Sequence, residues 1–176
     1  MRYRRAQTAG ASYFFTVNLA DRRSDLLVQH IDELREVTRI VKRAHPFVIE
    51  AMVVLPEHLH AIWKLPEGDA DYPMRWSLIK SGFSRGLEKT ESIRASRLKK
   101  RERGIWQRRY WEHQIRDDYD FEKHVDYIHY NPVKHGYVKR PIDWPFSTLH
   151  RYVRTGVLPE HWGSDLAVED VSCGER

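Results

Sequence analysis

The chain has 176 residues, of which 41% are hydrophobic and 12% aromatic, so its composition excludes a disordered chain and favours one folded domain. A single cysteine, Cys173, excludes an internal disulfide and a thiolate metal cluster, so any metal must have nitrogen and oxygen ligands. The formal net charge is +5 and the sequence pI is about 9.3, and these cations are unevenly distributed. Since no apolar stretch approaches about 18 residues and residues 1–5 lack a secretory apolar segment, we expect a cytoplasmic protein without a membrane span.

The first part of the chain predicts three strands and one helix after a basic arm. Alternating apolar residues predict the first strand at residues 13–19. A helix over residues 25–44 follows, because apolar side chains recur there at helical spacing, and it should pack on the sheet. Strands at residues 47–54 and 58–65, joined by a short turn, should pair antiparallel. The arm spans residues 1–10, and its cations are Arg2, Arg4 and Arg5.

Two histidines lie two positions apart in the third predicted strand. Successive side chains of a strand point to opposite faces, so His58 and His60 share one face, with Cα atoms about 6.6 Å apart. Both imidazoles can therefore converge on one cation. The alternative is a pair of ordinary polar residues on a half-exposed strand. The apolar neighbours Leu59, Ala61 and Ile62 favour a buried strand, where imidazoles need partners.

A second helix from about residue 74 to residue 87 and a fourth strand near residues 110–115 enclose a strongly basic segment. Such a run is either a solvated face or a nucleic-acid surface. Aromatic rings in and after the run favour nucleic acid, because they can stack on bases beside cations that contact phosphates; they are Trp106, Tyr110 and Trp111. The cations of the segment are Arg94, Arg97, Lys99, Lys100, Arg101, Arg103, Arg108 and Arg109.

A third helix is predicted from about residue 117, where acidic residues cap it, to Pro132, which should stop it. At about 100° per residue, three polar side chains share the flank beside its apolar stripe: His124, Tyr127 and Asn131. Two other tyrosines, Tyr119 and Tyr130, point away from that stripe. If the flank lies over the histidine strand, a phenol and a carboxamide sit beside the imidazole pair. Alternatively, the Tyr127 ring merely anchors the helix.

Several motifs in a fixed order resemble a known family. His58-Leu59-His60 resembles the HUH motif of single-strand nucleases, and the run at residues 126–136 resembles REP-associated tyrosine transposases. The similarity covers most of residues 1–165 and includes residues 13–17, 54–57, 111–113 and 143–148. The resemblance implies a bacterial protein with a ferredoxin-like or palm-type α+β fold. We expect a central antiparallel sheet of four to five strands, with helices packed on one face.

The resemblance also implies a chemistry. A divalent cation, Mg²⁺ or Mn²⁺, would be held by His58 and His60, and Asn131 stands where related transposases carry a glutamine ligand. Tyr127 would attack single-stranded DNA beside a REP hairpin and form a 5′-phosphotyrosine with a free 3′-hydroxyl. The phenol needs a proton acceptor, either water held by the cation or a nearby base such as His124. The basic arm and the basic segment would contact phosphates or bases at the hairpin foot.

Two other functions stay open from the sequence. One is a hairpin-binding protein that does not cleave DNA; the other is a metal-dependent hydrolase that activates water and gives Tyr127 no role. We expect one nuclease domain at residues 1–158 and an acidic tail at residues 159–176, which either folds over the basic cleft or is solvated. The protein should be a nucleoid-associated monomer or homodimer.

Overall fold

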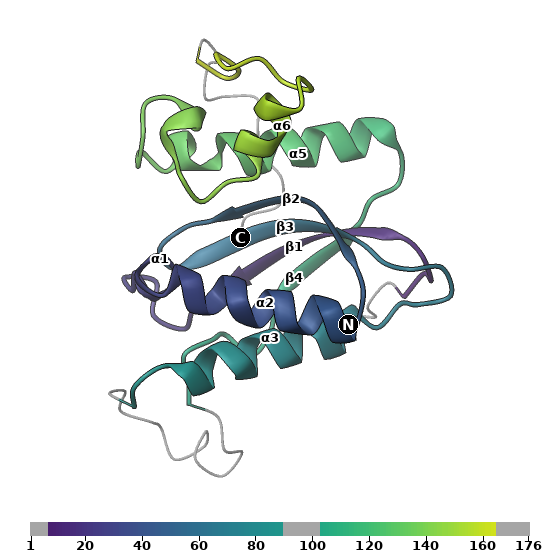
Figure 1. The fold of residues 1–176 in the computed structure, drawn as a ribbon, viewed down its shortest axis with the longest axis vertical. Helices are drawn as coiled ribbons and strands as arrows, with labels where there is room; N and C mark the ends of the chain where they lie inside the picture. Colours follow the sequence, from purple (N-terminus) through teal and green to yellow (C-terminus); the bar gives the residue numbers. More distant parts are fainter. Residues whose placement is uncertain (1–6, 90–102, 165–176) are drawn as a thin grey trace, which may run out of the picture.

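The structure is a computed structural model that describes residues 7–89 and 103–164 (Figure 1). Its strands are β1 (Ser12–Asn18), β2 (Val48–Val54), β3 (His58–Lys64) and β4 (Trp111–Gln114). Its helices are α1 (Leu26–Gln29), α2 (Ile31–Ala44), α3 (Tyr72–Gly86), α5 (Asp118–Lys134) and α6 (Leu149–Arg154), with a 3₁₀ turn η1 (Pro141–Asp143). None of the helices in these two ranges is long and apolar enough to cross a membrane.

The four strands form one antiparallel sheet in the order β2-β3-β1-β4. Because β3 lies between β2 and β1, its backbone is hydrogen-bonded on both sides. In this register His60 lies opposite Thr16 of β1, and His58 lies opposite Asn18. The α+β class and the antiparallel sheet expected from the sequence are confirmed, and the histidine strand is an inner strand.

Helices cover both faces of the sheet, so the expectation that they pack on one face is wrong. On one face Phe15 and Trp63 pack with α2 and α3, and on the other Phe14 and Ile62 pack with α5 (Figure 1). The alternation in β1 and β3 suggested a single apolar face. However, Phe14 and Ile62 occupy the intervening positions and are fully buried, so each inner strand buries apolar side chains on both faces.

Helix α5 begins as predicted but does not stop at Pro132. The Asp117 side chain accepts a hydrogen bond from the Asp120 N–H at 2.8 Å and caps the first turn. Pro132 lies within the helix, which continues to Lys134, because a proline near the last turn removes only one backbone hydrogen bond. The expectation that Pro132 ends the helix is therefore wrong, and Asn131 is helical.

The tyrosines away from the apolar stripe of α5 have different surroundings. Tyr119 is exposed, but Tyr130 is buried. A Cβ added to Gly163 would lie 3.4 Å from Tyr130 Cδ2 and 2.9 Å from Pro141 Cγ, so the chain after α6 passes close to this helix. Tyr130 is therefore absent from the cluster that the apolar stripe forms with the sheet, and it is buried because a later part of the chain covers it.

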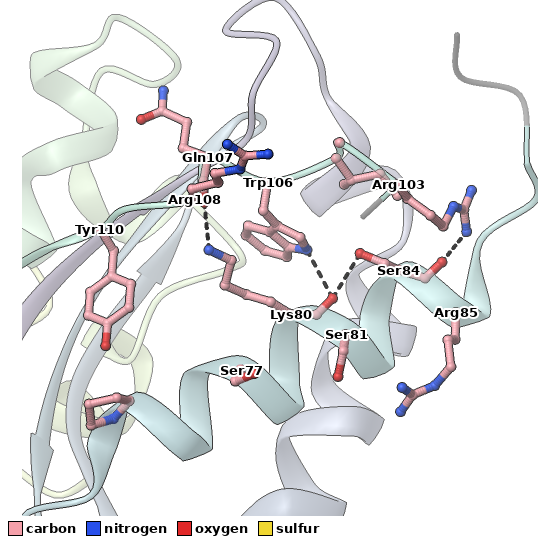
Figure 2. Close-up of a pocket in the computed structure, with 13 residues that line it drawn as sticks. Ser77, Lys80, Ser81, Ser84, Arg85, Arg103, Trp106, Gln107, Arg108 and Tyr110 are labelled. Atoms are coloured by element: carbon pink, nitrogen blue, oxygen red, sulfur yellow. Dashed lines mark hydrogen bonds between the residues drawn. The ribbon is translucent and has the colours of Figure 1, made fainter. Parts of the chain in front are cut away.

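Residues 103–110 run beside α3 before they enter β4 (Figure 2). Trp106 Nε1 donates to the Lys80 carbonyl oxygen at 3.1 Å, and Lys80 Nζ donates to the Gln107 carbonyl oxygen at 2.6 Å. The Gln107 backbone N–H donates to the Asn18 carbonyl oxygen at 2.9 Å. This segment is therefore attached both to α3 and to the end of β1.

Candidate active site

The two histidines of β3 lie side by side on the face of the sheet that α5 covers. Both are buried, and their ring centroids are 4.9 Å apart at an interplanar angle of 81°. His58 Nδ1 is hydrogen-bonded to Glu57 Oε1 and His60 Nδ1 to Thr16 Oγ1, each at 2.9 Å. These bonds fix both rings and leave Nε2 as the nitrogen with which each could bind a cation.

Glu57 supports the pair, although the sequence suggested only a turn residue there. Its carboxylate also accepts a hydrogen bond from the Tyr137 hydroxyl at 3.3 Å, and Arg22 Nη2 lies 3.6 Å away. Burial would raise the pKa of Glu57, but the hydrogen bond and charge of His58 outweigh it, so the pKa lies below its ordinary value. The sequence did contain a signal for this role of Glu57, because an acidic residue directly precedes a candidate metal-binding histidine.

Tyr127 of α5 lies next to this pair, as the helical flank predicted. Its ring centroid is 5.0 Å from that of His60, at an interplanar angle of 72°, and 5.9 Å from that of Phe14. Lys134 Nζ lies 4.8 Å from the ring centroid, which is within the range of a cation–π contact. Tyr127 is only 1% exposed. The phenol is thus beside the imidazoles but shielded from solvent.

Asn131 lies one helical turn after Tyr127 and is fully buried. Neither Oδ1 nor Nδ2 of its amide has a hydrogen-bond partner within residues 7–89 and 103–164. A buried amide without partners costs about 1–3 kcal/mol, so such an amide indicates a ligand. Two imidazoles and an amide oxygen suit a divalent cation with mixed nitrogen and oxygen ligands. In the types of donor atom that they offer, these residues therefore fit the cation that the sequence predicted.

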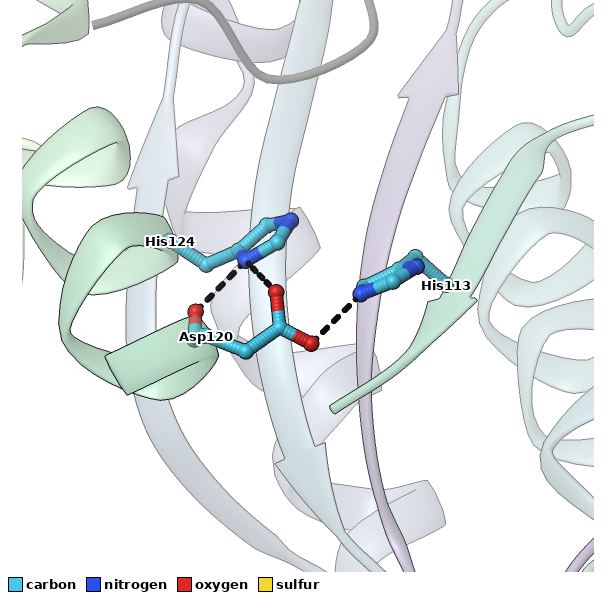
Figure 3. Close-up of side chains that lie close together, drawn as sticks. All are labelled: His113, Asp120 and His124. Atoms are coloured by element: carbon cyan, nitrogen blue, oxygen red, sulfur yellow. Dashed lines mark hydrogen bonds and ion pairs between the residues drawn. The ribbon is translucent and has the colours of Figure 1, made fainter. Parts of the chain in front are cut away.

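A second cluster, which the sequence analysis did not identify, joins β4 to α5 (Figure 3). His113 Nε2 lies 2.7 Å from Asp120 Oδ2, and His124 Nδ1 lies 2.7 Å from the Asp120 carbonyl oxygen and 3.3 Å from Oδ1. The ligand atoms of these three residues lie within 4.8 Å of one another, so this group could also hold a metal ion. The spacing of Asp120 and His124 on one helix face was the only sequence signal.

The electrostatics of this cluster keep Asp120 ionised and His124 neutral. Burial would raise the pKa of Asp120, but hydrogen bonds from His113 and Arg116 outweigh it and lower the pKa to about 2. Burial lowers the pKa of His124. The His124 ring lies 4.7 Å from Phe14, which also contacts Tyr127. The role of His124 as proton acceptor stays a prediction, and only its Nε2 could serve, because Nδ1 contacts Asp120.

Replacing Asp120 with Asn should lower the free energy of unfolding at pH 7 by about 2 kcal/mol, because Asn cannot replace the charged hydrogen bonds to His113 and Arg116. The folded pKa of about 2 lies below the ordinary 3.8, so this stabilisation is present above about pH 4 and is lost as the pH falls towards 2. Denaturant unfolding of the metal-free protein between those pH values measures it. The exposed residue in the same turn provides the control Asp118→Asn, and equal pH dependence of the wild type and Asp120→Asn would contradict the assignment.

The predicted DNA-binding cations are only partly within the described residues. Arg103 donates to the backbone carbonyls of Leu87 and Ser84, so it holds the end of α3, whereas Arg108 and Arg109 are exposed. Outside the described residues lie Arg2, Arg4, Arg5, Arg94, Arg97, Lys99, Lys100 and Arg101, together with tail residues 165–176.

Comparison with known proteins gives close relatives for nearly the whole chain, although no protein-family model matches it. A REP-associated tyrosine transposase of Escherichia coli K12 is 51% identical over 174 residues, which cover 99% of this chain and 96% of that protein. A Haemophilus influenzae protein provisionally given the same name is 46% identical over 164 residues, 93% of each chain. The solved structure of a REP-associated tyrosine transposase bound to a REP hairpin matches with a TM-score of 0.85 and 49% identity, over 100% of this chain and 98% of the other.

Proposed function

Because the chain belongs to the REP-associated tyrosine transposase family, we propose that it is a metal-dependent endonuclease and strand transferase that cleaves single-stranded DNA beside REP-type hairpins. The observation that carries this proposal is the Tyr127 ring beside His60, with the buried amide of Asn131 on the same helix. All these residues belong to one chain, so a monomer suffices. The nuclease domain spans residues 1–158 and acts in the cytoplasm, at the nucleoid.

The divalent cation, either Mg²⁺ or Mn²⁺, would be held by Nε2 of His58, Nε2 of His60 and Oδ1 of Asn131. When bound, the cation polarises the scissile phosphate. Glu57 and Thr16 orient the two imidazoles through hydrogen bonds to Nδ1. The cluster of His113, Asp120 and His124 is the competing location for an ion, and variants in each group separate the two.

Tyr127 acts as the nucleophile. Its Oη forms a bond to phosphorus while the bond from phosphorus to the 3′-oxygen breaks, which leaves a 5′-phosphotyrosine and a free 3′-hydroxyl. Attack by a 3′-hydroxyl on that phosphotyrosine reverses the step and rejoins or transfers the strand. A phenol has an ordinary pKa of about 10, so the attack requires a group that accepts its proton. His124, whose ring contacts Phe14 as the Tyr127 ring does, is one candidate acceptor for the proton, and water held by the cation is the other.

The alternative function is hairpin binding without cleavage. The burial of Tyr127 favours it, because DNA reaches the hydroxyl only after the groups that cover the ring move. A metal-dependent hydrolase, the third function considered, would produce free 5′-phosphate ends and would not require Tyr127. Hairpin affinity does not separate these functions, whereas covalent capture does.

The test uses a REP-type hairpin with a single-stranded flank, labelled at either end and incubated with the protein and Mn²⁺. Attack by Tyr127 leaves the 5′ end of the downstream fragment on the protein. On a denaturing gel, the 3′ label should therefore migrate with the protein, and the 5′ label should appear as a shorter free strand. Release of both labels as free strands would indicate hydrolysis, and intact DNA would indicate a binding protein.

A further inference from the structure

A basic groove lies between α3 and residues 103–110 (Figure 2). Its volume is about 620 Å³, and none of the residues that line it within the described chain is acidic. The cations at the groove are Lys80, Arg85, Arg103 and Arg108.

The groove has fixed walls and exposed charges. Lys80 and Arg103 donate to backbone carbonyls across it, so these two cations hold residues 103–110 against α3. Arg85 and Arg108 are exposed at its two walls, where their guanidinium groups can contact phosphate oxygens bidentately. Lys80 and Arg103 therefore hold the two walls of the groove together, while Arg85 and Arg108 add positive charge at its exposed edges.

The groove also offers hydroxyl groups and aromatic rings. Ser77, Ser81 and Ser84 follow one another along the α3 wall at helical spacing. Lys80 Nζ lies 5.9 Å from the ring centroids of both Trp106 and Tyr110. The Ser81 and Ser84 hydroxyls donate to the carbonyl oxygens of Leu78 and Lys80, so the donors for a nucleic-acid backbone are the guanidinium groups, with aromatic rings nearby.

Residues 103–110, which form one wall of the groove, lead directly to the face of the sheet that α5 and its Tyr127 cover. Tyr110 packs with Phe15 on the α3 side, and the next residue, Trp111, lies 5.6 Å from Phe14 on the α5 side. Trp111 is 36% exposed, and Phe14 contacts the Tyr127 ring. A strand that leaves the groove therefore crosses the edge strand β4 beside an exposed indole before it reaches Tyr127.

We propose that this groove binds the phosphodiester backbone of the DNA that Tyr127 cleaves, with Arg85 and Arg108 as its phosphate contacts and Trp111 as the stacking position at the sheet edge. The inference rests on the proposed function and adds a second, separate DNA contact to it. The same chemistry is offered by the paired stem of a hairpin and by its single-stranded flank, and the binding assay distinguishes them.

The experiment measures fluorescence anisotropy of three labelled DNAs: the hairpin with its flank, the blunt hairpin and the flank alone. Arg85→Ala and Arg108→Ala should each weaken binding of the flanked hairpin by about 3- to 10-fold. Each should reduce the slope of log Kd against log salt by about 1, because one phosphate contact is lost. The control is Arg43→Ala, an exposed arginine of α2 away from the groove, which should change Kd less than about twofold.

A loss of affinity for both hairpin DNAs but not for the flank alone assigns the groove to the stem, and a loss for the two flank-containing DNAs but not for the blunt hairpin assigns it to the single strand. Wild-type affinity and salt slope of the Arg85→Ala/Arg108→Ala double variant on all three DNAs would overturn the proposal. The same binding assays are repeated with the groove substitutions combined with Tyr127→Phe, so that DNA affinity is measured in a protein that cannot form the covalent adduct. If the groove variants weaken binding while the wild type forms no adduct, the groove assignment stands and the cleavage proposal fails.

Discussion

Replacing Tyr127 with Phe is expected to abolish the covalent DNA adduct and to reduce strand cleavage by about 10⁴-fold or more, because the attacking oxygen is removed. The ring itself remains, so its packing against His60 and Phe14 is retained and the fold is preserved. Hairpin affinity should stay within about twofold of the wild type, since no phosphate contact is lost. Denaturing electrophoresis with 3′-labelled DNA measures the adduct, and anisotropy measures affinity.

A matched control comes from the same helix. Tyr130 is also buried, lies three residues later, and packs near Pro141 and Gly163 rather than beside the histidines. Tyr130→Phe should therefore keep the adduct at the wild-type level. An adduct in Tyr127→Phe, or its loss in Tyr130→Phe alone, would remove Tyr127 from the mechanism.

Replacing His60 with Ala is expected to reduce Mn²⁺-dependent cleavage by about 10³-fold or more. The loss of one ligand weakens the binding of the cation that polarises the phosphate. His60 is fully buried and its Nδ1 is fixed by Thr16, so no neighbouring group takes over its position. Mn²⁺ binding, measured by electron paramagnetic resonance of the free ion, should weaken in parallel.

Glu57→Gln should weaken Mn²⁺ binding by about 10- to 100-fold, because Glu57 orients His58.

His113→Ala provides the comparison that decides between the two candidate ion sites. It removes a member of the cluster with Asp120 and His124 but leaves the β3 pair intact. We expect it to retain most Mn²⁺ binding and most cleavage. If His113→Ala loses Mn²⁺ binding while His60→Ala keeps it, the ion belongs to the second cluster and the assignment to β3 is wrong.

The sequence predicted those parts of the site that depend on local periodicity. The alternation of β3 placed His58 and His60 on one face, and the helical repeat of α5 placed Tyr127 towards them; both expectations agree with the ring distances. Chain periodicity fixes which residues share a face, because side-chain direction follows backbone geometry. The assignment of roles to these residues stays a prediction.

The features that the sequence did not predict depend on contacts between distant segments. Asp120 of α5 meets His113 of β4, and Tyr137 meets Glu57 across 80 positions of chain, so neither contact has a local pattern. The second covered face of the sheet was missed because the alternating apolar residues of the first strand were taken to define one core face, and Phe14 lies between them. Pro132 was expected to end the helix because the sequence does not show where the helix ends. Two more helical residues follow it, so the proline disturbs only the last turn.

The histidines and the tyrosine are held by different kinds of interaction. His58 and His60 belong to an inner strand with a hydrogen-bonded neighbour on each side, whereas Tyr127 belongs to a helix whose buried side chains pack on the sheet. Uncovering the phenol therefore requires displacing side-chain contacts but not breaking the strand ladder. The spacing between the two imidazoles should consequently be kept when the phenol is uncovered, whereas the Asn131 amide, on the same helix as Tyr127, would move with that helix.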